Sequence, residues 1–232
     1  MENMAEAFAD KVVFTIPIFG GINITEALLT SWGIMLFIIL LSVIFVRKLN
    51  IFPKKIQTVV EIFVNWIYDF FTETLGENGK RYIPILGSML LFIAFSNLCG
   101  LFGFTPPTKS LSVTAGLALI SITLVLSSAI KNLGTKKWLK SYTEPMAVVT
   151  PFNVLEIIIR PLSLCLRLFG NVIGAYIIME LIHGLVPVFI PVVFSLYFDI
   201  FDGLLQAYVF VFLTAVYMSE GLEGEEVKIK NK

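Results

Sequence analysis

The sequence has little charge and little of the chemistry that catalytic or metal sites use. Charged residues make up 15% of its 232 positions, against about one quarter in soluble domains, and the formal net charge is zero. It has one histidine, and its two cysteines, Cys99 and Cys165, stand far apart in apolar segments. A balanced charge argues against nucleic-acid binding, and these ligands form no recognisable metal site. We therefore expect no nucleic-acid partner, no bound metal and no cofactor.

Apolar residues are abundant instead. Hydrophobic residues make up 57% of the chain, including 21 phenylalanines, and the mean hydropathy is +0.87. Such a chain has too few polar groups to cover its own apolar surface in water. Long apolar segments predict an all-α membrane protein, because a helix satisfies its own backbone hydrogen bonds in lipid.

The apolar segments are long enough for about five membrane-crossing helices, since about 20 residues cross the hydrocarbon core. The expected spans are 27–46, 83–103, 113–130, 154–183 and 191–218. Residues 56–75 differ, because acidic side chains recur among their apolar residues; this pattern is typical of an amphipathic helix at the membrane interface or against a neighbour. Residues 131–140, KNLGTKKWLK, are expected to form a basic loop.

We expect one membrane domain over residues 1–232. Its parts are an outer N-terminal segment at 1–26, three spans within 27–130, a helical hairpin at 151–218 and an inner charged tail at 219–232. Lysine and arginine favour the cytoplasmic side of a membrane. They gather between the first two spans and at 131–150, whereas the turn at 104–112 has one and the hairpin tip at 184–190 has none. This alternation predicts an N-terminus outside and a C-terminus in the cytoplasm.

One positive charge stands alone in an apolar stretch. Residues 162–179 contain Arg167 and no other charged side chain. A guanidinium keeps its proton in proteins, and insertion scales put its cost at the bilayer centre at roughly 2.5–3.5 kcal/mol. A charge at that depth usually faces a water-filled path or an opposite charge. We therefore take Arg167 as a functional residue; a snorkelling arginine is the alternative, which its place near the middle of the expected helix disfavours.

Further polar residues lie along the last two helices. Glu156 and Arg160 have the spacing of a helical ion pair, which is also what a solvated interfacial pair would show. The other candidates are Asn171, Tyr176 and Glu180 on the first helix and Asp199, Asp202 and Gln206 on the second. Unpaired carboxylates are costly to bury, so these acids imply a hydrated, carboxylate-lined cleft that ends at a fixed positive charge. Such a charge suits the release of a cation from a carboxylate on a moving partner.

The residues leave a second class of function open. A secondary transporter would use Arg167 to bind an anionic substrate, and such transporters contain repeated halves with paired broken helices. The sequence shows no such repeat. No nucleophile and base stand together, so an intramembrane enzyme is disfavoured.

Residues 160–171 read RPLSLCLRLFGN, which resembles the signature of subunit a of F-type ATP synthases. The resemblance covers nearly the whole chain in order and spacing. Other similar segments are TEALLTSW, VRKLNIFPKKIQTVVEIFVNWI, NLCGLFGFTPPTKSLSVTAGLAL and LLQAYVFVFLTAVYMSEG.

This resemblance implies a non-catalytic, ion-translocating stator subunit in a bacterial plasma membrane. Its hairpin packs against the rotor ring of c subunits, and its other partners are the peripheral-stalk b subunits, the rest of the synthase and the lipid bilayer. Arg167 would be the arginine that faces the ring carboxylates, with Asn171 its neighbour, Gln206 opposite and Glu156 near the inner of two offset half-channels. Ions would enter one half-channel, ride on the ring and leave by the other, while Arg167 blocks a short circuit.

The sequence departs from the family pattern at two positions. Tyr176 stands where many members have a glutamate, and Ser110 stands where many have an aspartate. Glu180, or Asp199 or Asp202 opposite, would supply the missing acid. Alternatively the ion is sodium, which needs oxygen ligands rather than a proton-relaying acid. The proton is the preferred coupling ion and sodium is the alternative.

Overall fold

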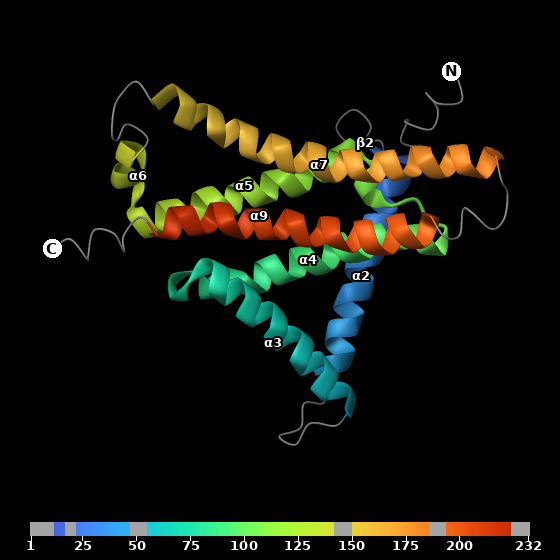
Figure 1. Ribbon diagram of the computed structural model, residues 1–232, viewed down its shortest axis with the longest axis horizontal. Coiled ribbons are helices and arrows are strands. Elements are labelled where there is room, and N and C mark those ends of the chain that lie inside the picture. The colour runs from blue at the N-terminus through green and yellow to red at the C-terminus, as the bar shows by residue number, and fades with distance from the viewer. Residues whose placement is uncertain (1–11, 17–21, 47–54, 142–149, 186–193, 224–232) are drawn as a thin grey trace. The chain divides into compact units, whose positions relative to one another are not determined.

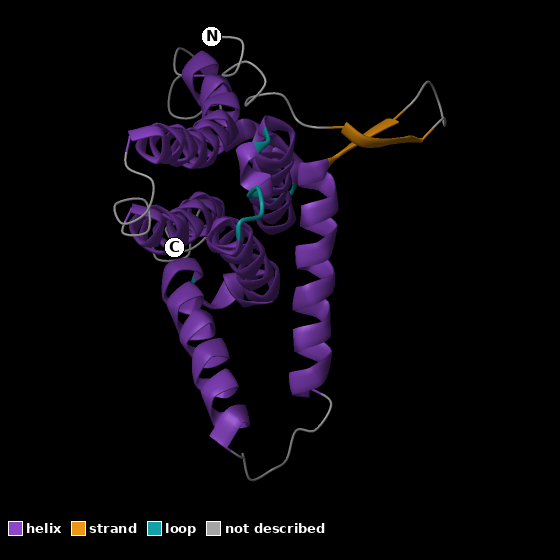
Figure 2. Cartoon of the chain, turned by 90° about the vertical axis from the view of Figure 1, so that its right-hand side faces the viewer, coloured by secondary structure: helices purple, strands orange, loops and turns teal. Residues whose placement is uncertain are grey.

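Helices make up most of the described chain in this computed structural model (Figures 1 and 2). The structure describes residues 12–16, 22–46, 55–141, 150–185 and 194–223. Five helical stretches among them are long and apolar enough to cross a membrane, which confirms the predicted all-α membrane class. They are Glu26–Val46, Glu77–Phe102, Leu111–Leu133, Thr150–Met179 and Leu196–Leu222.

The first span, α2 (Glu26–Val46), matches the prediction to within one residue at its start. Two short strands precede it, β1 (Val12–Ile16) and β2 (Ile22–Thr25), which pair antiparallel with an irregularity between Val12 and Phe14. Figure 2 shows this pair as the strand part of a chain otherwise made of helices and turns. Both strands are rich in β-branched residues, which favour extended backbone, but the pair was not predicted.

Helix α3 (Lys55–Leu75) is amphipathic, as the spacing of its acids indicated. Every fourth residue in its second half is buried, and residues four apart lie above one another on one face of a helix. The buried residues of this face are Ile67, Phe71 and Leu75. Its carboxylates are exposed. A position at the membrane interface stays a prediction.

The second span is helix α4 (Ile83–Leu98) with a 3₁₀ turn at each end, η1 (Glu77–Tyr82) and η2 (Cys99–Phe102). It ends at Gly103, whose φ of 77° is readily adopted by glycine. Pro106 and Pro107 then lead into a third 3₁₀ turn, η3 (Pro107–Lys109), which lies within the turn predicted at 104–112.

Helix α5 (Leu111–Leu133) extends past both predicted ends of the third span. The basic segment after it was wrongly predicted as a loop, because residues Thr135–Ser141 form a short helix, α6. Gly134 separates the two helices with a φ of 76°, and the Trp138 amide donates to its carbonyl at 2.9 Å. A single residue with positive φ redirects the chain here, and the helix resumes at once.

Helix α7 (Thr150–Leu185) is 36 residues long and begins four residues before its predicted start. Pro161 lies inside it without ending it. Proline removes one backbone donor from a helix, and the hydrogen-bonded turns on either side carry the helix through. The predicted hairpin tip at 184–190 lies largely outside the described residues.

The last span begins with a π-helix, η5 (Leu196–Asp202), and continues as helix α9 (Gly203–Glu223). The predicted helical pattern at 191–218 is confirmed over its described residues, but the π-helix in its first part was not predicted. The predicted end was wrong, because residues 219–223, assigned to the charged tail, are helical. Short π-helical segments are rare and frequently occur at functional sites.

The described residues fall into two compact units whose boundaries lie inside helices, and the predicted single membrane domain stays a prediction. The first unit comprises the described parts of Met1–Ser42, Leu91–Thr114 and Arg167–Ala207. The second comprises the described parts of Val43–Leu90, Ala115–Leu166 and Tyr208–Lys232. The interior of the first unit contains the polar residues Ser96, Asn97, Thr108 and Gln206. The interior of the second is mainly apolar, with Phe71, Leu86, Phe210 and Met218.

Polar bonds and small residues hold α5 against α9 within the second unit. Ser121 and Thr214 share a hydrogen bond of 2.8 Å between their hydroxyl oxygens. A Cβ added to Gly221 would lie 2.8 Å from the Cβ of Ala129, so only glycine allows this approach. Apolar side chains gain little by leaving lipid for a helix interface, so close packing and hydrogen bonds carry helix association in membranes.

Candidate functional site

Arg167 lies within the span formed by α7, and its side chain is exposed. The neighbouring Leu168 is fully buried, so the arginine points away from the interior of the first unit. Within the described part of the chain, its guanidinium makes no ion pair or hydrogen bond. A charge inside an apolar span without an internal partner needs water or a partner from another molecule.

Asn171, one helical turn after Arg167, links α7 to the beginning of α9. Its amide Nδ2 donates to Oε1 of Gln206 at 2.7 Å. Gln206 is 2% exposed, and its buried Nε2 has no hydrogen-bond partner among the described residues. The structure therefore brings together two of the predicted site residues and leaves one amide donor without an acceptor.

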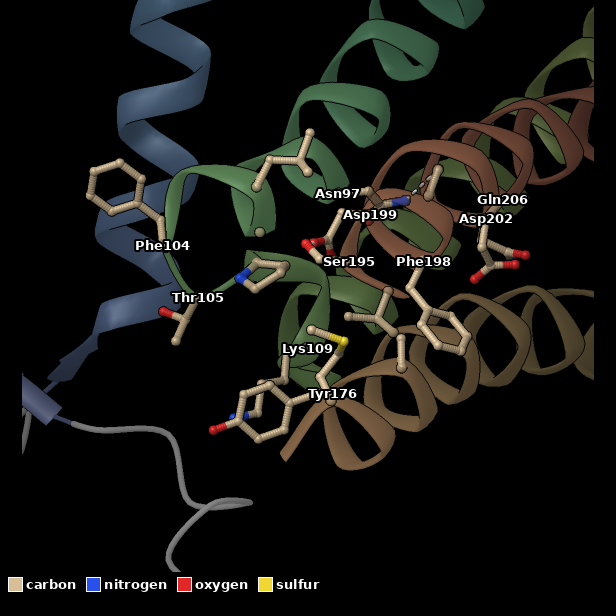
Figure 3. Close-up of a pocket in the computed structure, with 18 of the residues that line it drawn as sticks. Asn97, Phe104, Thr105, Lys109, Tyr176, Ser195, Phe198, Asp199, Asp202 and Gln206 are labelled. Carbon is tan, nitrogen blue, oxygen red and sulfur yellow. Dashed lines mark hydrogen bonds between the residues drawn. The ribbon is translucent and has the colours of Figure 1, made fainter. Parts of the chain in front are cut away.

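An open pocket of about 610 Å³ lies in the same unit, and we call it the aspartate pocket. Its walls are the end of α4 and the turn that follows it, residues of the second half of α7, and η5 with the first turn of α9 (Figure 3). The predicted site residues on its walls are Tyr176, Asp199, Asp202 and Gln206. Residues from three separate parts of the sequence thus meet around one open pocket.

The two aspartates of the pocket come from the π-helix η5, and both are half-buried. Ser195 Oγ donates to Oδ2 of Asp199 at 2.6 Å. A Cβ added to Gly100 would lie 2.7 Å from Oδ1 of Asp199, so the absence of a side chain there makes room for the carboxylate. Asp199 is thus held from two sides at the pocket wall.

The ring of Tyr176 lies under a cation. The ammonium of Lys109 is 3.5 Å from the centroid of its ring (Figure 3). A cation over an aromatic face contributes about 0.5–2 kcal/mol, depending on its exposure to water. The contact joins the turn η3 to α7 on one side of the aspartate pocket. Ser110, the second departure from the family pattern, is buried next to this lysine.

A second charged group lies in the second unit, and we call it the Arg160 cluster. Arg160 Nη2 donates to Oε1 of Glu156 at 2.7 Å and to Oε2 of Glu220 at 2.6 Å. The guanidinium carbon also lies 4.6 Å from the ring centroid of Tyr217. The predicted pairing of Glu156 with Arg160 is confirmed, and the cluster of these four residues carries a net charge of −1.

Residues 28–219 match the model of the family described as ATP synthase A chain. The ATP synthase subunit a of Moorella thermoacetica is 35% identical over 208 residues, which cover 88% of this chain and 94% of that protein. This chain belongs to the ATP synthase A chain family. It is a multi-pass membrane subunit whose partner is the rest of the ATP synthase, and the catalysis of the complex lies in other subunits.

Two further relatives of this ATP synthase family member illustrate the range of the family. The ATP synthase subunit a 1 of Crocosphaera subtropica is 35% identical over 213 residues, covering 90% of this chain and 92% of that protein. A subunit a of Propionigenium modestum, named as sodium ion specific, is 29% identical over 222 residues, covering 89% of this chain and 77% of that protein.

Sequence reasoning missed Asn97, which organises the interior of the first unit in this family member. The residue is 4% exposed; its Nδ2 donates to the Gly203 carbonyl at 2.8 Å, and its Oδ1 accepts from Thr108 Oγ1 at 2.8 Å. Gly203 adjoins the end of η5, so Asn97 ties the turn after α4 to the point where the π-helix ends. An asparagine inside an apolar span was the signal that could have found it.

Two other outcomes concern acids. Glu220 was assigned to the tail and is instead a member of the Arg160 cluster; the tail prediction is wrong here because α9 continues to Glu223. Glu180 lies on α7, and its side chain lies outside the described part of the chain. Among the described residues, no group of three metal-ligating side chains lies together.

Proposed function

We propose that this chain is the ion-translocating stator subunit of a rotary F-type ATP synthase. It provides two offset half-channels that load and unload cations on the carboxylates of the c-subunit ring. Arg167 lies between the two half-channels and prevents ions from passing directly from one to the other. Torque on the ring then drives ATP synthesis in the soluble subunits of the complex.

The observation that carries this proposal is the exposed, unpaired Arg167 in the middle of an apolar span. Exposing a guanidinium to lipid is costly, so another chain must cover this face of α7. A carboxylate on a ring helix fits, because an opposite charge within about 4–6 Å favours the ionised form and expels the bound cation. The small residue Gly170, also exposed, lets the backbone of a partner helix approach beside the arginine.

The aspartate pocket is our candidate for the outer half-channel. Asp199 and Asp202 attract a cation there, and Tyr176 lines the path. Asn171, one helical turn after Arg167, is bonded to Gln206 of the pocket wall. Glu180 belongs to the same proposal, as the acid one helical turn beyond Tyr176.

The inner half-channel is assigned to the Arg160 cluster, with Glu156 as the acid that exchanges ions with the cytoplasmic solution. Its side chain is 54% exposed in the isolated chain, which leaves the carboxylate accessible to an ion. The basic loops support a cytoplasmic C-terminus and an external N-terminus in a bacterial plasma membrane. Peripheral-stalk b subunits complete the set of proposed partners.

The proton is the proposed coupling ion, and sodium is the second candidate because of the sodium-specific relative. Two aspartates, a serine hydroxyl and water would also serve a hard cation, which prefers oxygen ligands. ATP hydrolysis by the assembled complex at fixed pH distinguishes them. A rate independent of sodium supports the proton, and stimulation by sodium assigns sodium.

The proposed function predicts that Arg167→Ala abolishes ATP-driven ion pumping in membrane vesicles. Truncating one partner of a desolvated charge pair costs about 2–5 kcal/mol, so pumping should fall by at least about thirtyfold. ATP hydrolysis by the soluble subunits should remain measurable. The matched control is Arg81→Ala, which removes an exposed arginine of η1 outside the site. Unimpaired pumping by Arg167→Ala would end the proposal.

A further inference from the structure

The last turn of α9 carries the second acid of the Arg160 cluster, Glu220. Glu220 Oε2 lies 2.6 Å from Arg160 Nη2, and Glu156 Oε1 lies 2.7 Å from the same nitrogen. Two carboxylates therefore share one guanidinium nitrogen. Each is about half exposed, at 54% for Glu156 and 51% for Glu220, whereas the arginine side chain is 20% exposed.

Packing around α9 fixes Glu220 in this position. The adjacent Gly221 lies against Ala129 of α5, where a Cβ would come within 2.8 Å of the alanine. Asn132 Nδ2 donates to the Leu222 carbonyl at 2.9 Å, which satisfies an end of the helix that has no partner within the helix itself. Glu220 therefore sits on an anchored helix end, directly before the two residues that make these contacts.

Arg160 is also held by a contact independent of its carboxylates. The ring of Tyr217, three residues before Glu220, lies under the guanidinium at 4.6 Å. The arginine is thus fixed in place while its two half-exposed partners compete for one nitrogen. If either carboxylate binds a cation, the guanidinium keeps the other as its partner.

We propose that Glu220 is a positioning residue, which weakens the hold of Arg160 on Glu156 and so keeps that carboxylate open to the coupling ion. This inference rests on the proposed inner half-channel and adds Glu220 to it. Without Glu220, Arg160 pairs with Glu156 alone, and this pair has no net charge. An arriving cation must then displace the guanidinium from Glu156 without the attraction of a second carboxylate. With Glu220 present, the cluster keeps one surplus negative charge.

The test is Glu220→Gln in the assembled complex, in inverted vesicles whose cytoplasmic side faces the medium. ATP-driven pumping is measured while proton concentration is varied at fixed sodium and sodium at fixed pH. The half-saturating concentration of the pumped ion should rise by about twofold to fivefold, the range expected for a partly exposed charge pair. The maximal rate should change less. Glutamine keeps the size and the acceptor oxygen, so a purely structural role would leave this value unchanged.

Two further variants complete the test. Glu77→Gln is the matched control, because Glu77 also holds a cation at 2.6 Å, that of Lys80, and is 80% exposed. In an Arg160→Gln background, Glu220→Gln should have no further effect, since Glu220 acts through the arginine. Such loss of additivity is the mark of two groups that act together.

The outcomes separate this inference from the proposed function. If Glu220→Gln behaves as Glu77→Gln does while Glu156→Gln raises the half-saturating concentration, the inference is overturned and the inner half-channel stands. If Glu156→Gln also has no effect, the inner half-channel itself fails. Failure of the Glu220→Gln subunit to assemble would overturn the inference as well, because it would show that the charge of Glu220 is needed for folding or assembly.

Discussion

Three residues of the proposed path are each fixed by a specific neighbour. Ser195 holds Asp199, Asn171 holds Gln206 and Lys109 covers Tyr176. The last contact gives Tyr176 a role that needs no acid group. Its ring carries a cation–π contact, which leaves the acid function to other residues of the pocket.

This arrangement predicts different effects for two conservative substitutions. Tyr176→Phe keeps the ring under Lys109, so ATP-driven pumping should change by less than about twofold. Asp199→Asn keeps an acceptor for Ser195 but removes the charge, so pumping should fall by at least about tenfold, as for other positioned acids. Asp202→Asn and Glu180→Gln are measured beside them in the same vesicles. Equal, small effects of all four variants would refute the hypothesis that Asp199, Asp202 or Glu180 serves as the acid of this half-channel.

The charged residues were the part of the site that could best be predicted from the sequence. Arg167 is conspicuous because charge is rare in apolar spans, and the pair Glu156–Arg160 follows from helical spacing. Glu220 was missed because a glutamate among other charges near the end of a chain looks like part of a solvated tail. Its contact with Arg160 joins residues 60 positions apart, which no local pattern encodes.

At the scale of elements, the π-helix and the packing of α9 decide which residues meet. The spans were predictable because about 20 apolar residues suffice to identify a membrane helix. The π-helix was not predictable, because its sequence, LYFDIFD, has no local feature that excludes a regular α-helix. Its neighbours are distant in sequence instead: Asn97, in the last turn of α4, bonds Gly203 at its end, and Gly100 leaves space for Asp199.

The packing of α9 predicts that two glycines respond differently to substitution. Gly221→Ala places a Cβ 2.8 Å from Ala129 and should destabilise the subunit by about 1–3 kcal/mol, the usual cost of overpacking. Gly116→Ala, in α5, meets nothing within 4 Å and should be neutral or stabilise its helix by up to about 1 kcal/mol. Thermal denaturation of the purified complex in detergent measures both. A Tm for Gly221→Ala equal to that of Gly116→Ala would contradict the close approach.

At the scale of the whole molecule, an isolated subunit with an exposed arginine in a span is incomplete. Five candidate spans place that arginine at membrane depth, and the described chain offers it no counter-charge. The family membership accounts for this, because the subunit works within a larger complex. The central claim is therefore that the rotor supplies the missing partner.

A density map of the assembled enzyme in lipid tests that claim most directly. We predict that the Arg167 side chain points toward the ring, within about 4–6 Å of a ring carboxylate in at least one rotary state. Water density should fill the aspartate pocket and the surroundings of the Arg160 cluster as two separate bodies. An arginine turned away from the ring, or one continuous column of water running past it, would contradict the account.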